Sequence, residues 1–439
     1  MSVRPPVRPT VRPLALSLAR PSSRAVRLLV GAVSALLLPA SLLTWTPAGA
    51  ADDSAGGSAG GSALATSDAA PDSVSVRASA HQRIRLEALP QVVQPGGSLA
   101  SPDAARAAVV ATLRPVRPGR RVQLQVQDGA SWRAVGTRRQ DGAGRVQFAA
   151  AASDGAAALT YRVKAMASGR TSPFRSAPVS TARWLVPTWT DEFSGSQLEP
   201  VWNHRGREYA DGSRRSCAKG DPSAVSVGGG AVRLSVVKDP DATTRCRIRG
   251  RDARPGRFGY RLNGHIGTQH AFAFRYGVAA ARVRFHRLRG QHGAFWLQPV
   301  DGMHAGALGS EIDVVEYFGD HHPQGGLASF VHRYEGKRRI ATGGWIPDSR
   351  SFLTGRRDGW SRNYHVFSVE WTPRTLVFRI DGKETRRIRG RTSAVSQFPI
   401  LSLIAANYEI PKIEERRLPQ HMYVDWVRVW ETGAESPAG

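Results

Sequence analysis

Residues 309–318 read Gly-Ser-Glu-Ile-Asp-Val-Val-Glu-Tyr-Phe, so three carboxylates stand among β-branched residues and two aromatic residues follow. β-Branched and aromatic residues favour a strand whose back face packs into a core. Because side chains along a strand alternate between its two faces, Glu311 and Asp313 would share one face and Glu316 would point to the other. A regular strand therefore separates the third acid from the first two.

A β-bulge would bring the three acids together. One extra residue at Val314 or Val315 returns Glu316 to the face of Glu311 and Asp313. Glu311 and Glu316 then behave like strand positions four apart, about 13 Å between backbones, and side chains leaning inward would bring their carboxyl groups to about 5.5 Å. This separation suits double displacement at an anomeric carbon, where one carboxylate attacks and the other protonates the leaving oxygen. An exposed acidic face and a row of calcium ligands are the alternatives.

The sequence around this stretch also favours strands. The 439 residues include 45 Gly and 28 Pro, which suit many turns, and no segment keeps a helical period over a useful length. We expect an all-β jelly-roll sandwich over residues 184–432, with a concave face that could hold an extended ligand. Its clearest strand patterns lie at residues 232–236, 278–285, 367–371, 376–380 and 423–430.

A second, smaller β-domain is expected before it, over residues 81–183. Apolar residues alternate with glutamines along 122–126, and Asp128-Gly129 is typical of a hairpin turn. The spacing of such runs fits an immunoglobulin-like or fibronectin-like sandwich. It contains no ionisable cluster that suggests chemistry, so we favour a spacer over a polysaccharide-binding module.

The N-terminal 50 residues are typical of a secretory signal peptide. The first 27 carry six Arg and no acid, and an apolar run from Leu28 to Leu43 follows. This run is shorter than a membrane span needs, which disfavours an uncleaved anchor. We therefore expect a secreted, extracellular protein in which residues 51–80 form a flexible linker and 433–439 a short tail.

Cys217 and Cys246 are the only two cysteines. After export both would lie in an oxidising compartment, so we predict a disulfide between them, with two buried free thiols as the alternative.

The net charge of +26 would suit an anionic partner. Its arginines, however, are scattered through Ala- and Gly-rich sequence, and no helix-turn-helix, zinc-finger or RNP-like pattern accompanies them. We expect no nucleic-acid partner, no membrane partner once the signal is cleaved, and a monomer.

Several motifs in order resemble glycoside hydrolase family 16, the laminarinase-like β-glycanases, over about residues 184–432. The resemblance implies a jelly-roll fold and an endo-acting, retaining β-glycoside hydrolase that acts on polysaccharide and needs no cofactor for catalysis. Besides the acidic stretch, the matching segments are residues 189–193, 274–277, 293–297, 364–373, 380–382 and 423–430.

The same resemblance assigns roles to the three acids. Glu311 looks like the nucleophile, Glu316 like the general acid/base, and Asp313 like the assisting carboxylate between them. Two residues between Asp313 and Glu316 are similar to the laminarinase-type branch, which makes β-1,3-glucan the expected substrate. The alternatives are β-galactans or anionic polysaccharides, transglycosylation at the same site, and a non-catalytic carbohydrate-binding jelly roll.

Four further residues take roles from the resemblance. Trp296 resembles a residue that stacks on a sugar ring, with core packing as the alternative. His332 falls near the acids, where it would contact substrate or make a structural hydrogen bond. Family members often hold a structural calcium on the outer face, which points to Glu192 and Asp425, although Asp425 could instead pair with backbone or an arginine.

Two segments depart from the family pattern. Residues 401–408 replace an expected Asn and Gly-Gly pair, so one wall of the site would differ. Residues 211–259 are rich in Arg and hold both cysteines. A basic rim of this kind would favour anionic chains.

Overall fold

The computed structural model of the chain describes residues 82–99, 101–250 and 254–433. The predicted signal peptide, the predicted linker and residues 434–439 of the predicted tail lie outside these ranges. Within them, regular structure consists of β-strands and six short 3-10 helices, without an α-helix. The all-β prediction is therefore confirmed. In the part of the chain that is described, no helix is long and apolar enough to cross a membrane.

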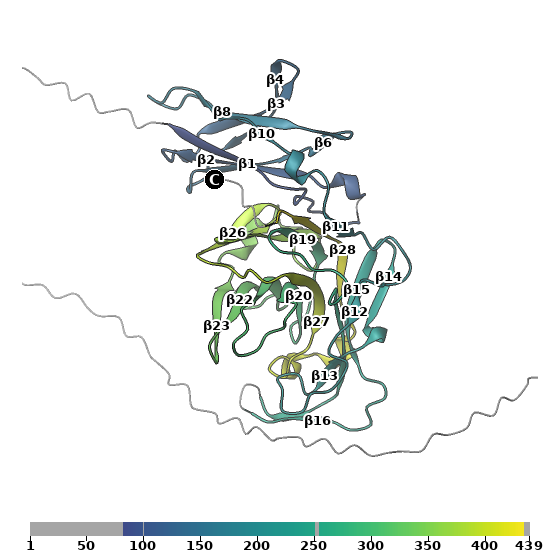
Figure 1. Ribbon diagram of the computed structural model, residues 1–439. Coiled ribbons are helices and arrows are strands. Elements are labelled where there is room, and N and C mark those ends of the chain that lie inside the picture. Colours follow the sequence, from purple (N-terminus) through teal and green to yellow (C-terminus); the bar gives the residue numbers. More distant parts are fainter. Residues whose placement is uncertain (1–81, 100, 251–253, 434–439) are drawn as a thin grey trace, which may run out of the picture. The chain divides into compact units, whose positions relative to one another are not determined.

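Most strands after residue 188 belong to one continuous sheet of 16 strands (Figure 1). Its main order is β23 (Arg338–Trp345), β22 (Leu327–Glu335), β21 (Ser310–Tyr317), β20 (His292–Pro299), β27 (Gln397–Ile404), β18 (Arg261–Gly267), β15 (Ala231–Lys238), β28 (Gln420–Glu431), β19 (Gly277–Arg284), β24 (His365–Thr372), β25 (Thr375–Ile380) and β26 (Lys383–Arg389). Four short strands pair at its margin: β11 (Trp189–Asp191), β12 (Asn203–His204), β13 (Ala218–Gly220) and β14 (Val225–Gly228).

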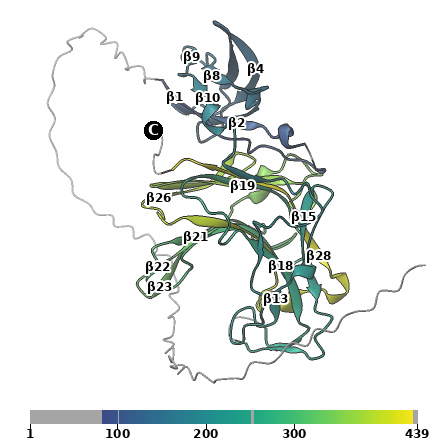
Figure 2. The same cartoon turned by 45° about the vertical axis from the view of Figure 1, so that its right-hand side comes forward.

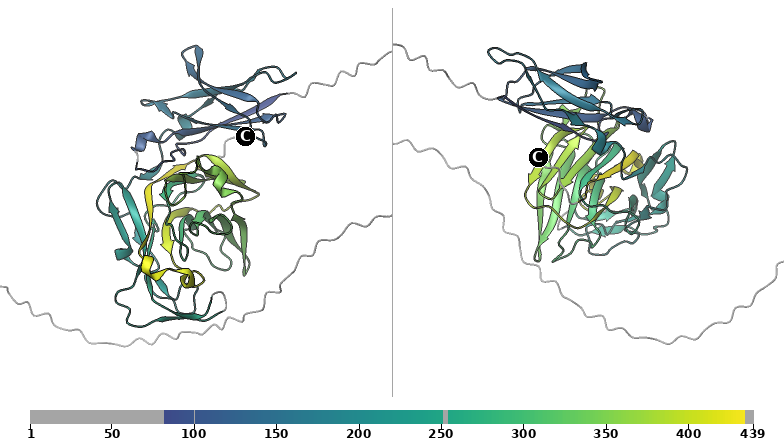
Figure 3. Two further views of the ribbon diagram at one scale, coloured as in Figure 1. Left: turned by 180° about the vertical axis from the view of Figure 1, so that it is seen from behind. Right: turned by 45° about the horizontal axis from the view of Figure 1, so that its top comes forward.

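This sheet folds into two layers that face each other across one core (Figure 2, Figure 3). Strand β18 pairs with β27 of one layer and β15 of the other, so it joins them. The core between the layers includes Phe295 and Ile312 from the first layer and Phe367 and Val427 from the second. These contacts establish the predicted jelly-roll sandwich. The 3-10 helices are η1 (Pro102–Ala104), η2 (Ala182–Trp184), η3 (Pro222–Ala224), η4 (Ser349–Phe352), η5 (Ile410–Lys412) and η6 (Glu415–Arg417).

Residues 83–180 form smaller sheets around a core of their own. Alternating Val122, Leu124 and Val126 are buried, and the chain turns at Gly129 as the Asp-Gly pattern predicts. The immunoglobulin-like or fibronectin-like type stays a prediction. One sheet has the order β1 (Arg83–Ala88), β2 (Ala107–Arg114), β5 (Arg145–Ala150), and the other β10 (Val179–Ser180), β8 (Thr160–Ala165), β3 (Arg121–Asp128), β4 (Ser131–Arg139). The short strands are β6 (Ser153–Asp154), β7 (Ala157–Ala158) and β9 (Phe174–Arg175).

A separate apolar cluster joins this N-terminal segment to β19 and β28. Leu89 and Val92 pack there with Trp426 and Trp430, and the indole Nε1 of Trp426 donates to Gln94 Oε1 at 2.7 Å. Since Val427 and Val429 point into the main core, the tryptophans that alternate with them lie on the outer face of the second layer.

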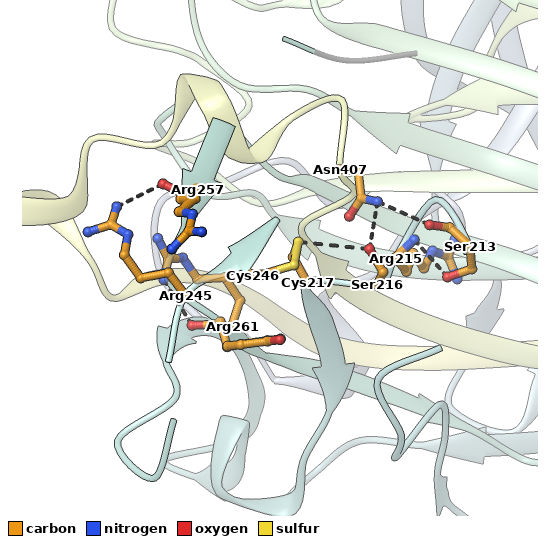
Figure 4. The surroundings of a disulfide bond; sticks show 10 residues. Ser213, Arg215, Ser216, Cys217, Arg245, Cys246, Arg257, Arg261 and Asn407 are labelled. Carbon is orange, nitrogen blue, oxygen red and sulfur yellow. Dashed lines mark hydrogen bonds between the residues drawn. A yellow bond between two sulfur atoms is a disulfide. The ribbon is translucent and has the colours of Figure 1, made fainter. Parts of the chain in front are cut away.

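Cys217 and Cys246 form the predicted disulfide (Figure 4). Cys246 begins β16 (Cys246–Ile248), which pairs with β17 (Gly256–Phe258), and Cys217 lies just before β13. The neighbouring Ser216 Oγ accepts a 3.0 Å hydrogen bond from the Asn407 side chain, which also donates to the Ser213 carbonyl. The disulfide therefore anchors a loop that contacts the segment after β27.

Removing this bond should destabilise the fold. Replacing Cys217 and Cys246 with serine frees a loop whose ends are 29 residues apart, and loop-closure entropy puts the loss in the free energy of unfolding at about 2–4 kcal/mol. Chemical denaturation of the two forms under non-reducing conditions measures it. An unchanged midpoint and slope would mean that the disulfide contributes nothing to stability.

Candidate active site

Strand β21 contains the predicted bulge. Against β20, Phe295 pairs with Val315 while the next residue, Trp296, pairs with Asp313, so Val314 is extra. Against β22, the register shifts between Asp313 and Glu316 as well. The bulge prediction is confirmed. The extra residue explains how Asp313 and Glu316 lie on the same face although two residues separate them.

The two faces of β21 differ in chemistry. Ile312, Val314, Val315 and Tyr317 belong to the main core, whereas Glu311 and Glu316 are only partly buried. Opposite the bulge, the Ser329 hydroxyl donates to the Val314 carbonyl at 2.9 Å, which satisfies a backbone group that the irregular pairing frees. We call the face turned away from the core, with Glu311, Asp313 and Glu316, the acid face.

Glu311 pairs with an arginine from the outermost strand of its layer. The Arg339 guanidinium of β23 lies 2.9 Å from Glu311 Oε1, and it remains half exposed whereas the glutamate side chain is 15% exposed. The two side chains form an ion pair. Arg339 therefore holds the Glu311 side chain in place at the acid face.

Asp313 lies between the two glutamates and is buried. Its Oδ2 is 3.3 Å from Nε2 of His332, which occupies the β22 position opposite Glu311. Burial, and after it the charge of Glu311, raise the pKa of Asp313 well above its usual value. Burial and the charge of Arg339 lower the pKa of His332. A neutral imidazole therefore contacts a carboxyl group that favours its protonated form.

The pKa of Glu316 is also raised. Burial, followed by the charge of Asp313, raises its pKa from 4.5 to about 7, while the charge of His292 acts against this shift. Nε2 of His292 lies 4.0 Å from Glu316 Oε1. A carboxyl group with this pKa holds a proton near neutrality and can deliver it, which is what a general acid requires.

Trp296 lies on the acid face and not in the main core. Ala294, Trp296, Phe398 and Ile400 form an apolar cluster of their own on β20 and β27, and Trp296 is 9% exposed. The indole donates to Ser402 Oγ at 3.2 Å, and its ring stacks with His265 at 6.1 Å between centroids. Its position beside Asp313 is compatible with the predicted sugar contact, which stays a prediction, as does substrate contact by His332.

The predicted calcium residues are held by arginines. Asp425 pairs with the buried Arg282, and Glu192 binds Arg428 through both carboxylate oxygens, at 2.7 and 2.9 Å. Calcium needs several oxygen ligands that face the cation, and guanidinium groups take that place here. The arrangement does not fit a calcium site; it contains the arginine pairing of Asp425 that the sequence offered as the alternative.

A different group has the spacing of metal ligands. Glu311, Asp313 and His332 offer ligand atoms within 4.8 Å of one another. Arg339 already contacts Glu311, however, and a cation there would have to tolerate this positive charge. The set is more consistent with acid–base chemistry than with metal binding.

Sequence reasoning did not identify several residues of the acid face. His292 shares a face with Ala294 and Trp296 by simple alternation, so the strand pattern contained a signal for it. Glu409, which contacts His292, directly follows the segment 401–408 that departs from the family pattern. No local sequence pattern indicated Arg339, because only the pairing of β22 with β23 brings this residue close to the acids.

Comparison with known proteins matches residues 223–428, just under half of the chain, to glycosyl hydrolases family 16. The glucan endo-1,3-beta-glucosidase A1 of Niallia circulans is 23% identical over 275 residues, covering 55% of this chain and 37% of that protein. The clotting factor G alpha subunit of Tachypleus tridentatus is 25% identical over 185 residues, covering 39% and 25%. The chain thus spans about a third and a quarter of these relatives.

This chain is also similar to solved structures. The laminarinase catalytic domain from Thermotoga maritima has a TM-score of 0.44 and 19% identity, covering 56% of this chain and 98% of that one. The endo-beta-1,3-glucanase from Pyrococcus furiosus has a TM-score of 0.43 and 19% identity, covering 55% and 92%.

Proposed function

We propose that this protein, whose residues 223–428 match glycosyl hydrolases family 16, is an endo-acting, retaining β-glycoside hydrolase whose substrate is β-1,3-glucan. The observation that carries the proposal is the bulge at Val314, which puts Glu311, Asp313 and Glu316 on one face. Double displacement needs one carboxylate as nucleophile and one carboxyl group as acid, and Glu311 and Glu316 would supply this pair.

In the first step, a Glu311 carboxylate oxygen bonds to the anomeric carbon as the glycosidic C–O bond breaks, and the Glu316 proton passes to the leaving oxygen. In the second step, the Glu316 carboxylate takes a proton from water while the water oxygen bonds to the anomeric carbon and releases Glu311. Asp313 assists from between the two. If a sugar hydroxyl replaces water, the same residues perform transglycosylation.

The substrate proposal rests on two similarities. Two residues separate Asp313 and Glu316, as in the laminarinase-type branch. The relative from Niallia circulans is also named a glucan endo-1,3-beta-glucosidase.

A substrate panel tests this proposal. The full chain is incubated with laminarin, mixed-linkage glucan, agarose and carrageenan; reducing ends are assayed, and the anomer first released is read by NMR. Release of β-anomeric oligosaccharides from laminarin supports the proposal. An α-anomer would exclude retention. Binding of laminarin without release would favour the non-catalytic carbohydrate-binding alternative.

Anionic polysaccharide is the second candidate substrate, and Arg205 favours it. The guanidinium lies over the Phe398 ring at 5.0 Å, and the side-chain oxygens of Gln269 and Gln298 accept from it, the latter at 2.7 Å. Among the described residues it forms no ion pair with a carboxylate. An anionic sugar substituent would supply the missing charge. Release from carrageenan that Arg205→Gln abolishes, without laminarin activity, would establish this candidate.

The pKa of Glu316 sets the expected pH dependence. Its pKa is raised to about 7, and the group must be protonated to act as an acid. We therefore expect kcat/KM to fall as pH rises through about 7, since the active form is lost on the alkaline side. A pH profile of laminarin hydrolysis measures this. An alkaline limb below pH 5 would assign acid catalysis to a carboxyl group of ordinary pKa.

We also propose that the protein is secreted through residues 1–50, acts as a monomer, and uses its N-terminal β-sandwich as a spacer. The apolar run that follows a basic N-terminus supports export. Contacts between the N-terminal segment and the outer tryptophans of β28, on the second layer, suit a spacer because the acid face belongs to the first layer.

A further inference from the structure

A buried histidine lies beside Glu316 and has no part in the two chemical steps above. His292 begins β20, and it is only 4% exposed. Ala294, two residues further along the same face, pairs with Glu316 across the β20–β21 ladder. The strand register therefore directs Nε2 of His292 toward Glu316, and the two groups are 4.0 Å apart. That distance is too long for a hydrogen bond, but short for two charges.

The other ring nitrogen of His292 binds a second buried acid. Nδ1 lies 2.6 Å from Oε2 of Glu409, which is 3% exposed. The same carboxylate oxygen accepts from the Ala406 backbone N–H at 3.0 Å, so the turn after β27 holds it in place. The rings of Phe318 and Tyr408 stack on the imidazole at 5.2 and 6.5 Å between centroids. The histidine is thus fixed in orientation from several sides.

The charges around this pair determine its protonation. Burial alone would lower the pKa of His292, but the charge and hydrogen bond of Glu409, with a contribution from Glu316, outweigh burial and raise it. Other titratable or charged groups that act on His292 or Glu316 are Asp313, His332, Arg215, His265, His286 and Tyr408. The imidazole therefore favours its charged form despite its burial.

We propose that His292, held by Glu409, is a positioning residue that places a buried imidazolium against Glu316 and stabilises the carboxylate that remains when Glu316 has given its proton to the leaving sugar. This inference rests on the proposed function of Glu316 as general acid. Neither His292 nor Glu409 is proposed to contact the substrate. Its effect is confined to the proton affinity of Glu316 and to the acid-assisted departure of the sugar.

The experiment compares wild type with His292→Gln in two measurements. The first is a carbon NMR titration of the Glu316 carboxyl, assigned with Glu316→Gln. The second is kcat/KM against glycosides of graded leaving-group ability. We expect His292→Gln to raise the pKa of Glu316 by about half a unit or more. We also expect a loss of about threefold for each half unit with the natural glucan, and a smaller loss with an activated aryl glycoside, which needs little acid assistance.

Two further variants guard against a general loss of structure. Glu409→Gln removes the partner of Nδ1 and should lower the pKa of His292 in imidazole proton NMR. His365→Gln disrupts another buried histidine, which lies 2.8 Å from Asp381 and 3.1 Å from Asp358. It should leave the Glu316 titration unchanged even if it lowers stability.

If the Glu316 titration is unchanged in His292→Gln and kcat/KM falls equally for all leaving groups, the proposal is overturned. His292 would then have only a structural role. The carboxyl titration does not need turnover. If wild type hydrolyses no substrate, the proposed function fails, yet the titration still decides whether His292 controls Glu316.

Discussion

Replacing Glu311 with alanine is expected to reduce kcat/KM by more than about a thousandfold, because no other carboxylate on the acid face is placed to form the glycosyl bond. Asp313 is buried and favours its protonated form, and Glu316 is the proposed acid. Added azide should restore turnover of an activated aryl glycoside: the small anion attacks the anomeric carbon in place of the missing side chain. A single displacement inverts configuration, so NMR should identify an α-glycosyl azide.

Glu335 provides a matched control for this substitution. It lies at the end of β22 and pairs with Arg333 at 2.6 Å, much as Glu311 pairs with Arg339, but it is exposed. Glu335→Ala should retain wild-type activity. If Glu311→Ala kept more than about a tenth of the wild-type rate, Glu311 could not be the nucleophile.

Replacing Glu316 with glutamine should lower activity and raise stability in alkaline buffer. Loss of the general acid is expected to reduce kcat/KM by about 10²–10⁴-fold with poor leaving groups. The native pKa of Glu316 is raised from 4.5 to about 7, so the native state binds the proton more tightly than the unfolded chain does. Stability is therefore lost as pH rises from the unfolded value through the native one. Above pH 7 this loss is on the order of 3 kcal/mol.

Glutamine cannot ionise and avoids that loss. Denaturation of wild type and Glu316→Gln at pH 4 and pH 8 measures the effect: the variant should gain stability relative to wild type at pH 8 and little at pH 4. Glu335→Gln serves as the exposed control. Its stability should differ from that of wild type by the same amount at both pH values. A variant no more stable at pH 8 than at pH 4, relative to wild type, would mean that Glu316 ionises in the native state at no cost.

The arrangement of the acidic stretch was predictable because side chains along a strand alternate between its two faces. This period of two shows which of the acids share a face. That period required an irregularity between Asp313 and Glu316, and the pairing of β21 with its neighbours contains one. The strands of the jelly roll were predictable for the same reason. The predicted residues 232–236 lie in β15, 376–380 in β25 and 423–430 in β28.

Residues that depend on distant pairing could not be predicted in this way. His292 and Glu409 are 117 positions apart and meet only because the turn after β27 closes over the start of β20. The arginine partner of Asp425 could not be predicted for a similar reason. Asp425 meets Arg282 through the register of β28 against β19, and no local pattern around either residue indicates that ion pair.

The bulge also determines which changes of length β21 can accept. Deleting Val314 would leave Asp313, Val315 and Glu316 in strict alternation, with both acids still on the acid face and the same number of strand steps from Glu311. Adding a residue instead would restore alternation by moving Glu316 two steps further along, about 6.6 Å. That distance would put the acid out of reach of the bond that the nucleophile attacks. A gene for this protein could thus lose a codon at the bulge and keep the spacing of its acids, but it could not gain one.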